Sequence, residues 1–330
     1  MKVLIVRQDG IGDALVLTPL LVALRDAGHE LGAVLSTRNA ELFARRTFTQ
    51  VHVTERIAWP RHGSTSATYT HALDDVRAAR YDAAIIATEE PEAYRFARAA
   101  GIPQRVGFWN GLEKPLKSLW VRMQCTRVVQ RAAQLGREPE HEAQTMSRLG
   151  AMLTGGAPPT TEVSRLRALI LDEQPEPIGD VLVQLTSKWR TIGVARGGVE
   201  AMLAALGERY AVRTIAPPEE LDDPRLLDEH VEITRTLAAW KRAVARAGVV
   251  VTPDTGTAHL AGMLGIPTVD VFADGASAVA QWARWHPWAT VAEQVLTRGE
   301  PETFAAEIRE AVDRFVRIFS SDDAEDESEA

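Results

Sequence analysis

The chain has 330 residues, 45% hydrophobic and 25% charged, which is typical of a globular protein large enough for two domains. A single cysteine excludes an internal disulfide framework and a cysteine-based metal cluster, and no apolar run approaches the roughly 20 residues that span a bilayer. The formal charge is −8, but the last eleven residues, SSDDAEDESEA, hold six acids; the rest has 37 basic and 39 acidic residues, a charge of −2. We expect this tail, residues 320–330, to be disordered.

The first 155 residues alternate strand-like and helix-like segments. The N-terminal stretch MKVLIV has too short an apolar run for a signal peptide, which favours a cytoplasmic protein, and KVLIV predicts a buried parallel strand. A helix is expected from about Asp13 to Ala27, with Gly28 as its stop. Pro19 predicts either a kink or a restart that Thr18 caps. LGAVLS and YDAAIIA predict two further strands, so the order implies a parallel sheet with helices on both faces.

The amino-acid composition changes at residues 156–178, where Pro, Gly, Thr and acidic residues cluster, and we place a linker there. The alternation resumes over 179–300: the strands VLVQL, VRTIAP, VVVTP and TVDVF are separated by helical patterns. Residues 301–319 form an amphipathic helix whose apolar stripe fits a core position. The sequence therefore predicts two α/β domains, 1–155 and 179–300.

The stretch VRQDGIGDALVLTPLL, residues 6–21, crosses from the first strand to the first helix. A dinucleotide fingerprint needs a third glycine, and Leu15 occupies that position. The acid expected after the second strand is also missing, although Ser36, Thr37 and Arg38 would suit a 2′-phosphate, so an NADP-dependent oxidoreductase stays open as an alternative.

Asp13 therefore needs another role. It is either only an N-cap of the helix, or a general base at the carboxyl end of the sheet, where open α/β folds bind ligands. Asp9 is a weaker candidate base on the same turn.

The second notable loop is VTPDTGTAHLAGMLGIPTVDVF, residues 251–272. A strand ends at its start, and Asp254, Thr255 and Gly256 lead into a helix expected from Thr257. Small residues and a helix N-terminus favour a bound phosphate. Thr255 and the backbone N–H groups of Gly256 and Thr257 would donate hydrogen bonds to it. Asp254 would hold sugar hydroxyls or cap the helix, and His259 is either a core residue or a ligand contact.

Basic residues concentrate between 113 and 137, where the only acid is Glu113. This segment is either a solvated helix face or a surface for an anionic acceptor or membrane. The cations of the segment are Lys114, Lys117, Arg122, Arg127, Arg131 and Arg137, and earlier arginines that would serve an anionic acceptor are Arg45, Arg46, Arg56 and Arg61. Three tryptophans at 282, 285 and 288 either stack on a sugar or base or pack internally. No interleaved basic and aromatic pattern points to a nucleic acid.

The loop DTGTAHLA with its GIP turn resembles the donor-site motif of glycosyltransferase family 9, the ADP-heptose:lipopolysaccharide heptosyltransferases. The opening Arg7, Ile11, Gly12, Asp13 and Pro19 match that family's N-terminal motif, and ARWHPW, residues 283–288, resembles the element after the donor loop. The similarity in order and spacing covers about residues 1–300. It implies a GT-B fold, two Rossmann-like doubly wound parallel-sheet domains facing across a cleft, with the acceptor on the first and the donor on the second.

The resemblance also assigns roles. It makes Asp13 the catalytic base and implies that the helix 301–319 returns to the first domain. The donor residues are Lys188, Asp254, Thr255, Gly256, Thr257 and His259, and those assigned to the acceptor are Gly12, Arg61 and Arg122. Lys188 matches a family lysine that contacts the donor phosphates, but Trp189 follows it directly and the family's proline is missing, so Arg190 is an alternative.

The resulting prediction is an inverting glycosyltransferase that moves a sugar, heptose from ADP-heptose, to an anionic glycan or glycolipid of the cell envelope. An inverting displacement needs one base and positive charge for the departing diphosphate, and no acid cluster resembles a metal cage, so we expect neither metal nor cofactor. A peripheral contact with the inner face of the membrane fits the basic segment. A sugar-nucleotide-binding protein without catalysis is the second alternative.

Overall fold

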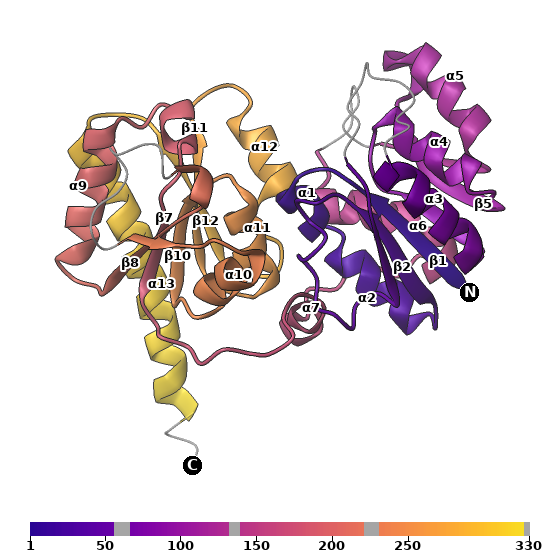
Figure 1. Ribbon diagram of the computed structural model, residues 1–330. Coiled ribbons are helices and arrows are strands. Elements are labelled where there is room, and N and C mark those ends of the chain that lie inside the picture. The colour runs from indigo at the N-terminus through magenta and orange to yellow at the C-terminus, as the bar shows by residue number, and fades with distance from the viewer. Residues whose placement is uncertain (56–66, 132–138, 221–230, 327–330) are drawn as a thin grey trace. The chain divides into compact units, whose positions relative to one another are not determined.

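The computed structural model describes residues 1–55, 67–131, 139–220 and 231–326. The chain divides into two compact units, Met1–Asp172 and Glu173–Ala330, which are drawn in Figure 1. The division falls inside the segment 156–178, where we placed the linker. Part of that segment is the helix α7 (Val163–Ile170), which packs against α2 (Thr18–Asp26) of the first unit.

The first unit is built on a six-stranded parallel sheet with the order β3-β2-β1-β4-β5-β6 among its described residues. Helices α3, α4 and α5 contribute to an apolar cluster on one face, whereas α2, α6 and α7 pack together away from it. The strands are β1 (Lys2–Arg7), β2 (Glu30–Leu35), β3 (Gln50–Val53), β4 (Ala83–Ile86), β5 (Gln104–Trp109) and β6 (Arg127–Gln130). The remaining helices are α1 (Ile11–Leu15), α3 (Ala67–Ala79), α4 (Pro91–Ala99), the 3₁₀ turn η1 (Gly111–Glu113), α5 (Pro115–Gln124) and α6 (Glu142–Thr154).

The second unit repeats this plan, with the parallel strand order β12-β11-β10-β7-β8-β9 among its described residues. Its strands are β7 (Val181–Gln184), β8 (Val212–Ala216), β9 (Val231–Ile233), β10 (Val249–Pro253), β11 (Thr268–Ala273) and β12 (Ala292–Thr297). Its helices are α8 (Lys188–Thr191), α9 (Arg196–Gly207), the 3₁₀ turn η2 (Pro218–Glu220), α10 (Leu237–Ala245), α11 (Gly256–Met263), α12 (Ala278–Trp285) and α13 (Pro301–Asp326).

Both strand orders are those of a doubly wound Rossmann sheet. The direction of winding reverses between β1 and β4 in the first unit, and between β7 and β10 in the second. Open α/β sheets bind ligands outside the carboxyl ends of the strands at such a switch point. The prediction of parallel sheets with helices on both faces is confirmed, and it places the two loops singled out in the sequence at the two switch points.

The first helix region is interrupted, as Pro19 required. α1 ends at Leu15, and α2 restarts at Thr18 with Pro19 in its first turn, where the missing N–H costs no hydrogen bond. The N-cap of α2 is Leu17 rather than Thr18, whose hydroxyl donates to the carbonyl of Leu15 at 2.7 Å. Gly28 follows α2 in the left-handed region, with φ at 76°, as expected for a C-terminal stop.

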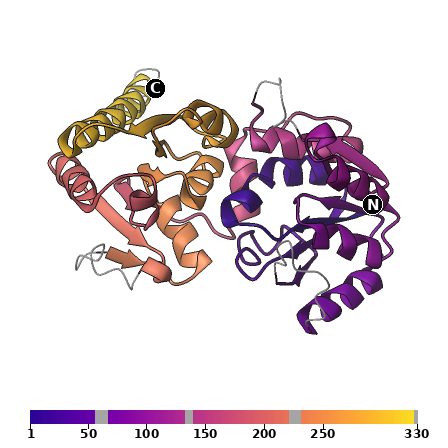
Figure 2. The same ribbon diagram turned by 90° about the horizontal axis from the view of Figure 1, so that it is seen from above.

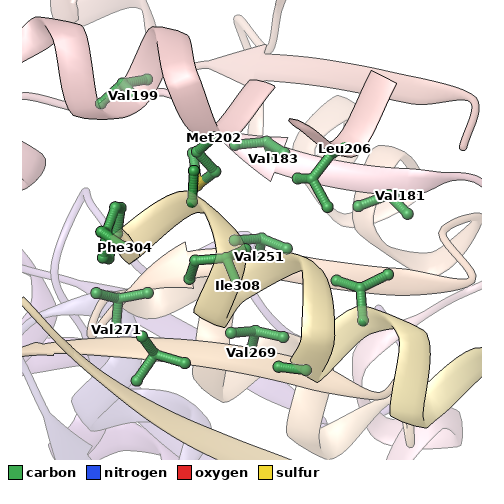
Figure 3. Close-up of a cluster of buried hydrophobic side chains, with 14 of the residues drawn as sticks. Val181, Val183, Val199, Met202, Leu206, Val251, Val269, Val271, Phe304 and Ile308 are labelled. Carbon is green, nitrogen blue, oxygen red and sulfur yellow. The ribbon is translucent and has the colours of Figure 1, made fainter. Parts of the chain in front are cut away.

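The last helix packs in the core of the second unit, whereas the resemblance implied that it returns to the first. Phe304, Ile308, Val312 and Phe315 of α13 are buried between α9 and the strands β7, β10 and β11. Figure 3 shows Phe304 and Ile308 beside Val251 and Val271, and Figures 1 and 2 show α13 alongside α9. The apolar stripe is satisfied within its own unit. The helix also continues to Asp326, into the acidic segment that we expected to be disordered from residue 320.

Candidate functional site

Asp13 is fixed at the start of α1, just beyond the end of β1. The N-cap of α1 is Gly10, so Asp13 is the third helical residue and not the cap. Arg7 Nη2 donates to Asp13 Oδ1 at 2.8 Å, and the N–H of Gly10 makes a longer contact of 3.3 Å with Oδ2. The side chain is 39% exposed. Arg7 and the N–H of Gly10 therefore hold the carboxylate in place, and part of it stays open to solvent.

The buried guanidinium of Arg7 organises this turn. It is 2% exposed, pairs with Asp9 at 3.3 Å and donates to the carbonyl of Ala87 after β4. Asp9 in turn accepts a hydrogen bond of 3.1 Å from the hydroxyl of Thr88. Asp9 thus ties the β1 loop to the β4 loop, which leaves Asp13 as the accessible acid of the pair.

A second charged cluster lies after β4. Glu89 accepts from Lys117 at 2.7 Å and from Arg131 at 2.6 Å, and Arg131 also pairs with the buried Glu142. Burial alone would raise the pKa of Glu89, but the hydrogen bonds and charges of Lys117 and Arg131 lower it to about 2. Burial acts to lower the pKa of Arg131, but the negative charges of Glu142, Glu89 and Asp13 outweigh it, so that pKa is raised. Asp13 and Glu89 therefore act electrostatically on the same guanidinium.

A cavity of about 810 Å³ opens beside this cluster. Its lining combines two acids, three cations and apolar side chains, and consists of Glu89, Glu90, Pro91, Arg95, Lys114, Leu116, Lys117 and Trp120. Sequence reasoning missed Glu89 and Glu142, because they pair with cations far along the chain. A polar residue directly after a buried strand was the available signal for Glu89.

The structure describes two of the three residues assigned to the acceptor. Gly12 lies in the first turn of α1, directly before Asp13. Arg122 is exposed on α5, with its guanidinium over the ring of Trp109 at 4.2 Å. Arg61 lies outside the described residues, as do Arg56 and Arg137.

In the second unit, Thr255 caps α11 and anchors the loop that precedes this helix, which the resemblance assigns to the donor and which we call the donor loop. Its hydroxyl accepts from the N–H of Thr257 at 3.2 Å and donates to Gln184 Oε1 at 2.7 Å, and Thr252 donates to the same oxygen at 2.7 Å. The hydroxyl of Thr257 is buried and accepts from Trp240 at 3.1 Å. The N–H of Thr257 is turned to the cap, whereas the N–H of Gly256, at the first helical position, is among the backbone donors that lack an intrahelical acceptor.

Lys188 follows β7, the strand beside β10, so it leaves the sheet at the same edge as the donor loop. Trp189 is buried in the core and donates to the carbonyl of Gln184 at 2.8 Å, which turns the chain sharply after the strand. The hydroxyl of Ser187 is held by the buried Glu220 at 2.9 Å. Lys188 is partly exposed and Arg190 is exposed. Gln184 and Glu220, which sequence reasoning overlooked, thus shape both loops.

His259 is buried behind the loop. Its Nε2 lies 4.0 Å from Asp254 Oδ1, and its ring meets that of Trp285 edge to face with centroids 5.5 Å apart. Asp254 stays partly exposed. The histidine therefore backs the carboxylate, while Trp285 and Trp282, which packs on Phe272, are engaged in internal contacts.

A buried acid lies beneath this loop. Strand register aligns Thr252, Asp270 and Gln294 across the neighbouring strands β10, β11 and β12, so that Asp270 lies next to Thr252. Asp270 is 0% exposed, and neither carboxyl oxygen has a hydrogen-bond partner in the described part of the chain. Burial, with a further contribution from the charge of Asp254, raises its pKa well above the ordinary value.

Replacing Asp270 by Asn is expected to stabilise the protein increasingly as pH rises. In the unfolded chain Asp270 ionises near pH 4, whereas in the folded chain it stays protonated. The free energy of unfolding of the wild type therefore falls by about 1.4 kcal/mol per pH unit until the folded pKa of Asp270 is reached. Asn does not titrate. Urea unfolding at pH 4.5 and pH 8 measures this, with Asp274→Asn as the exposed control. A stability difference that does not grow with pH would contradict the assignment.

No protein-family model and no curated protein matches the sequence. Solved structures do match. E. coli heptosyltransferase WaaC with ADP superposes with a TM-score of 0.71 at 21% identity, covering 96% of this chain and 99% of that chain. The fold is GT-B.

Two further GT-B matches agree. E. coli ADP-heptose lps heptosyltransferase II gives a TM-score of 0.68 at 14% identity, over 97% of this chain and 100% of that chain. A glycosyltransferase family 9 structure from Veillonella parvula gives 0.60 at 15% identity, over 90% and 86%. At these identities the likeness establishes the fold.

Among the helices of the described residues, none combines the length and the apolar content that crossing a bilayer requires. Within the same ranges, no group of three or more His, Cys, Asp and Glu side chains is placed to hold a metal ion.

Proposed function

We propose that this GT-B protein is an inverting, metal-independent glycosyltransferase that moves heptose from ADP-heptose to an anionic glycan or glycolipid of the cell envelope. The observation that carries the proposal is that each unit has a polar loop at its switch point: the loop of the first unit holds an accessible carboxylate, and the loop of the second leads into a helix N-terminus suited to a phosphate. The similar WaaC was solved with ADP, and also with ADP-2-deoxy-2-fluoro heptose, which supports this donor class.

Asp13 would act as the base. It takes the proton of an acceptor hydroxyl while that oxygen forms a bond to the anomeric carbon of the donor sugar. The bond from that carbon to the diphosphate breaks, and its electron pair leaves on the ADP. One carboxylate suffices for this displacement. Arg7 holds Asp13 in place throughout, because its guanidinium is fixed by Asp9 and by the β4 loop.

The second unit would stabilise the departing diphosphate. The N–H of Gly256, the dipole of α11 and the ammonium of Lys188 together supply positive charge without a metal ion. Asp254, backed by His259, would accept hydrogen bonds from sugar hydroxyls. Thr255 and Thr257 then shape the loop, because their hydroxyls are already bonded within the unit.

The acceptor is proposed to bind in the cavity beside Glu89, where Arg95, Lys114 and Lys117 offer charge to an anionic group. Gly12 would allow close approach to Asp13, and Arg122 would extend the cationic surface along α5.

Lys188→Gln is expected to weaken ADP binding by about 10- to 100-fold, since one charge-assisted hydrogen bond is worth about 1.5–3 kcal/mol. Calorimetric titration with ADP in EDTA measures it, and the neighbouring Arg190→Gln is the matched control. A loss of ADP affinity in Arg190→Gln alone would assign the phosphate contact to Arg190 instead of Lys188.

The wider test of the donor is thermal stabilisation by ADP, UDP, GDP, CMP and NADPH in EDTA, because a ligand of the folded state raises the Tm. Stabilisation by ADP supports the proposal. Stabilisation by UDP or GDP would be consistent with a transferase that uses another sugar nucleotide as its donor. Stabilisation by NADPH alone would favour the oxidoreductase.

A further inference from the structure

The turn η1 and the helix α5 carry an apolar stripe on their outer surface. Leu112 is 95% exposed, Leu116 83%, Leu119 61% and Met123 57%. Their spacing of four, three and four residues puts the positions on one side of a helix. Val121 is buried in the core of the unit, so the stripe faces away from that core. α5 lies at an outer edge of the first unit in Figure 1.

This arrangement differs from ordinary surface apolar residues. Single exposed apolar side chains are common, but a contiguous row of large ones marks an interaction surface. Burial of large apolar side chains is favourable, so a partner that covers this stripe gains binding free energy.

The charges beside the stripe indicate which partner that is. Lys114 and Arg122 are exposed on the same segment, Arg127 is exposed just after it, and Glu113 is the only acid from 111 to 127. A short helix with an apolar stripe flanked by cations is typical of helices that lie in the interface of an anionic membrane. Each cation near such a surface strengthens the attraction to it. A protein partner would need a matching acidic groove, whereas an anionic bilayer meets both requirements by itself.

We propose that α5 docks the first unit onto an anionic lipid bilayer, with Leu112, Leu116, Leu119 and Met123 at the boundary between headgroups and acyl chains. This goes beyond the transferase proposal and does not depend on it, because it concerns binding alone. Leu116 also lines the cavity beside Glu89, together with Lys114. A lipid-linked headgroup therefore has a short route from the bilayer surface to that cavity.

Sedimentation of the full chain with vesicles tests the proposal, using phosphatidylcholine with and without phosphatidylglycerol. The wild type is expected to bind the anionic vesicles and to bind the neutral ones weakly. The double variant Leu119→Glu, Met123→Glu should lower the partition coefficient by about tenfold or more. Lys114→Gln and Arg122→Gln should each lower it by about fivefold, on anionic vesicles only.

Met152→Glu is the matched control. Met152 is 44% exposed on α6, which packs with α2 rather than with the α3, α4 and α5 cluster, so its binding should match the wild type. Thermal melts check folding, and Leu119→Gln, Met123→Gln replaces the Glu pair if that pair unfolds. Equal binding of the wild type and the stripe variants to anionic vesicles overturns the proposal. So does a wild type that binds neither kind of vesicle. A dimer in sedimentation velocity that the stripe variants abolish, without vesicle binding, would assign the stripe to a second copy instead.

Discussion

Asp13→Asn is expected to lower turnover by about 10²- to 10⁴-fold and to leave the affinity for ADP unchanged. Asn has nearly the shape of Asp and can still accept from Arg7, but it cannot take a proton from an acceptor hydroxyl. The residues proposed to bind the ADP diphosphate all belong to the second unit, so ADP affinity should not depend on the charge of Asp13. ADP release from ADP-heptose, with heptose-free lipopolysaccharide as the acceptor probe, measures turnover, and calorimetry measures ADP affinity.

Asp9→Asn separates catalysis from local structure. Asp9 is more buried than Asp13 and is occupied by Arg7 and Thr88, so its loss should lower stability more than turnover. Near-normal turnover in Asp13→Asn would remove Asp13 as the base. A protein without catalysis would show no turnover in the wild type or in either variant, so the variants could differ from the wild type in stability alone.

Glu89→Gln is expected to destabilise the first unit by about 1–3 kcal/mol at pH 7. The folded pKa of Glu89 is about 2, held below the ordinary 4.5 by Lys117 and Arg131 against the opposing effect of burial. A depressed pKa gives stability that is fully present above pH 4.5 and is lost as pH falls towards 2. The Gln variant also leaves Arg131 with Glu142 as its remaining carboxylate pair at this cluster.

Urea unfolding between pH 7 and pH 3 tests this. The difference between wild type and Glu89→Gln should be constant above about pH 5.5 and should shrink below pH 4.5. Glu113→Gln, an exposed glutamate of the same unit, should differ little from the wild type. A constant difference down to pH 3 would mean that the ionised carboxylate of Glu89 does not carry the effect.

The parallel sheets could be predicted because their strands are short apolar runs separated by amphipathic helices. KVLIV and VVVTP are the clearest examples, and each lies beside its switch point. Gly28 and Pro19 are equally local: the backbone geometry of each residue fixes where a helix stops or restarts. The donor loop is local too, since its cap and its small residues are adjacent in the chain.

The remaining features depend on contacts between distant segments. Glu89 and Arg131 meet only because β4, β5 and β6 are neighbours, and Gln184 reaches Thr255 only because β7 lies beside β10. For the segment that contains α5, the sequence indicated only a basic surface. The exposed apolar stripe could not be predicted, because the spacing of its residues does not tell which face of the helix is buried. For α13 the amphipathic pattern predicted a buried face correctly, but not which unit buries it.

The most direct test of the proposed transferase activity is ADP release from ADP-heptose by the full chain in EDTA, with heptose-free lipopolysaccharide as the acceptor. We expect acceptor-dependent ADP release that survives EDTA and is lost in Asp13→Asn. Unchanged ADP-heptose, together with no binding of ADP in calorimetry, would contradict this activity.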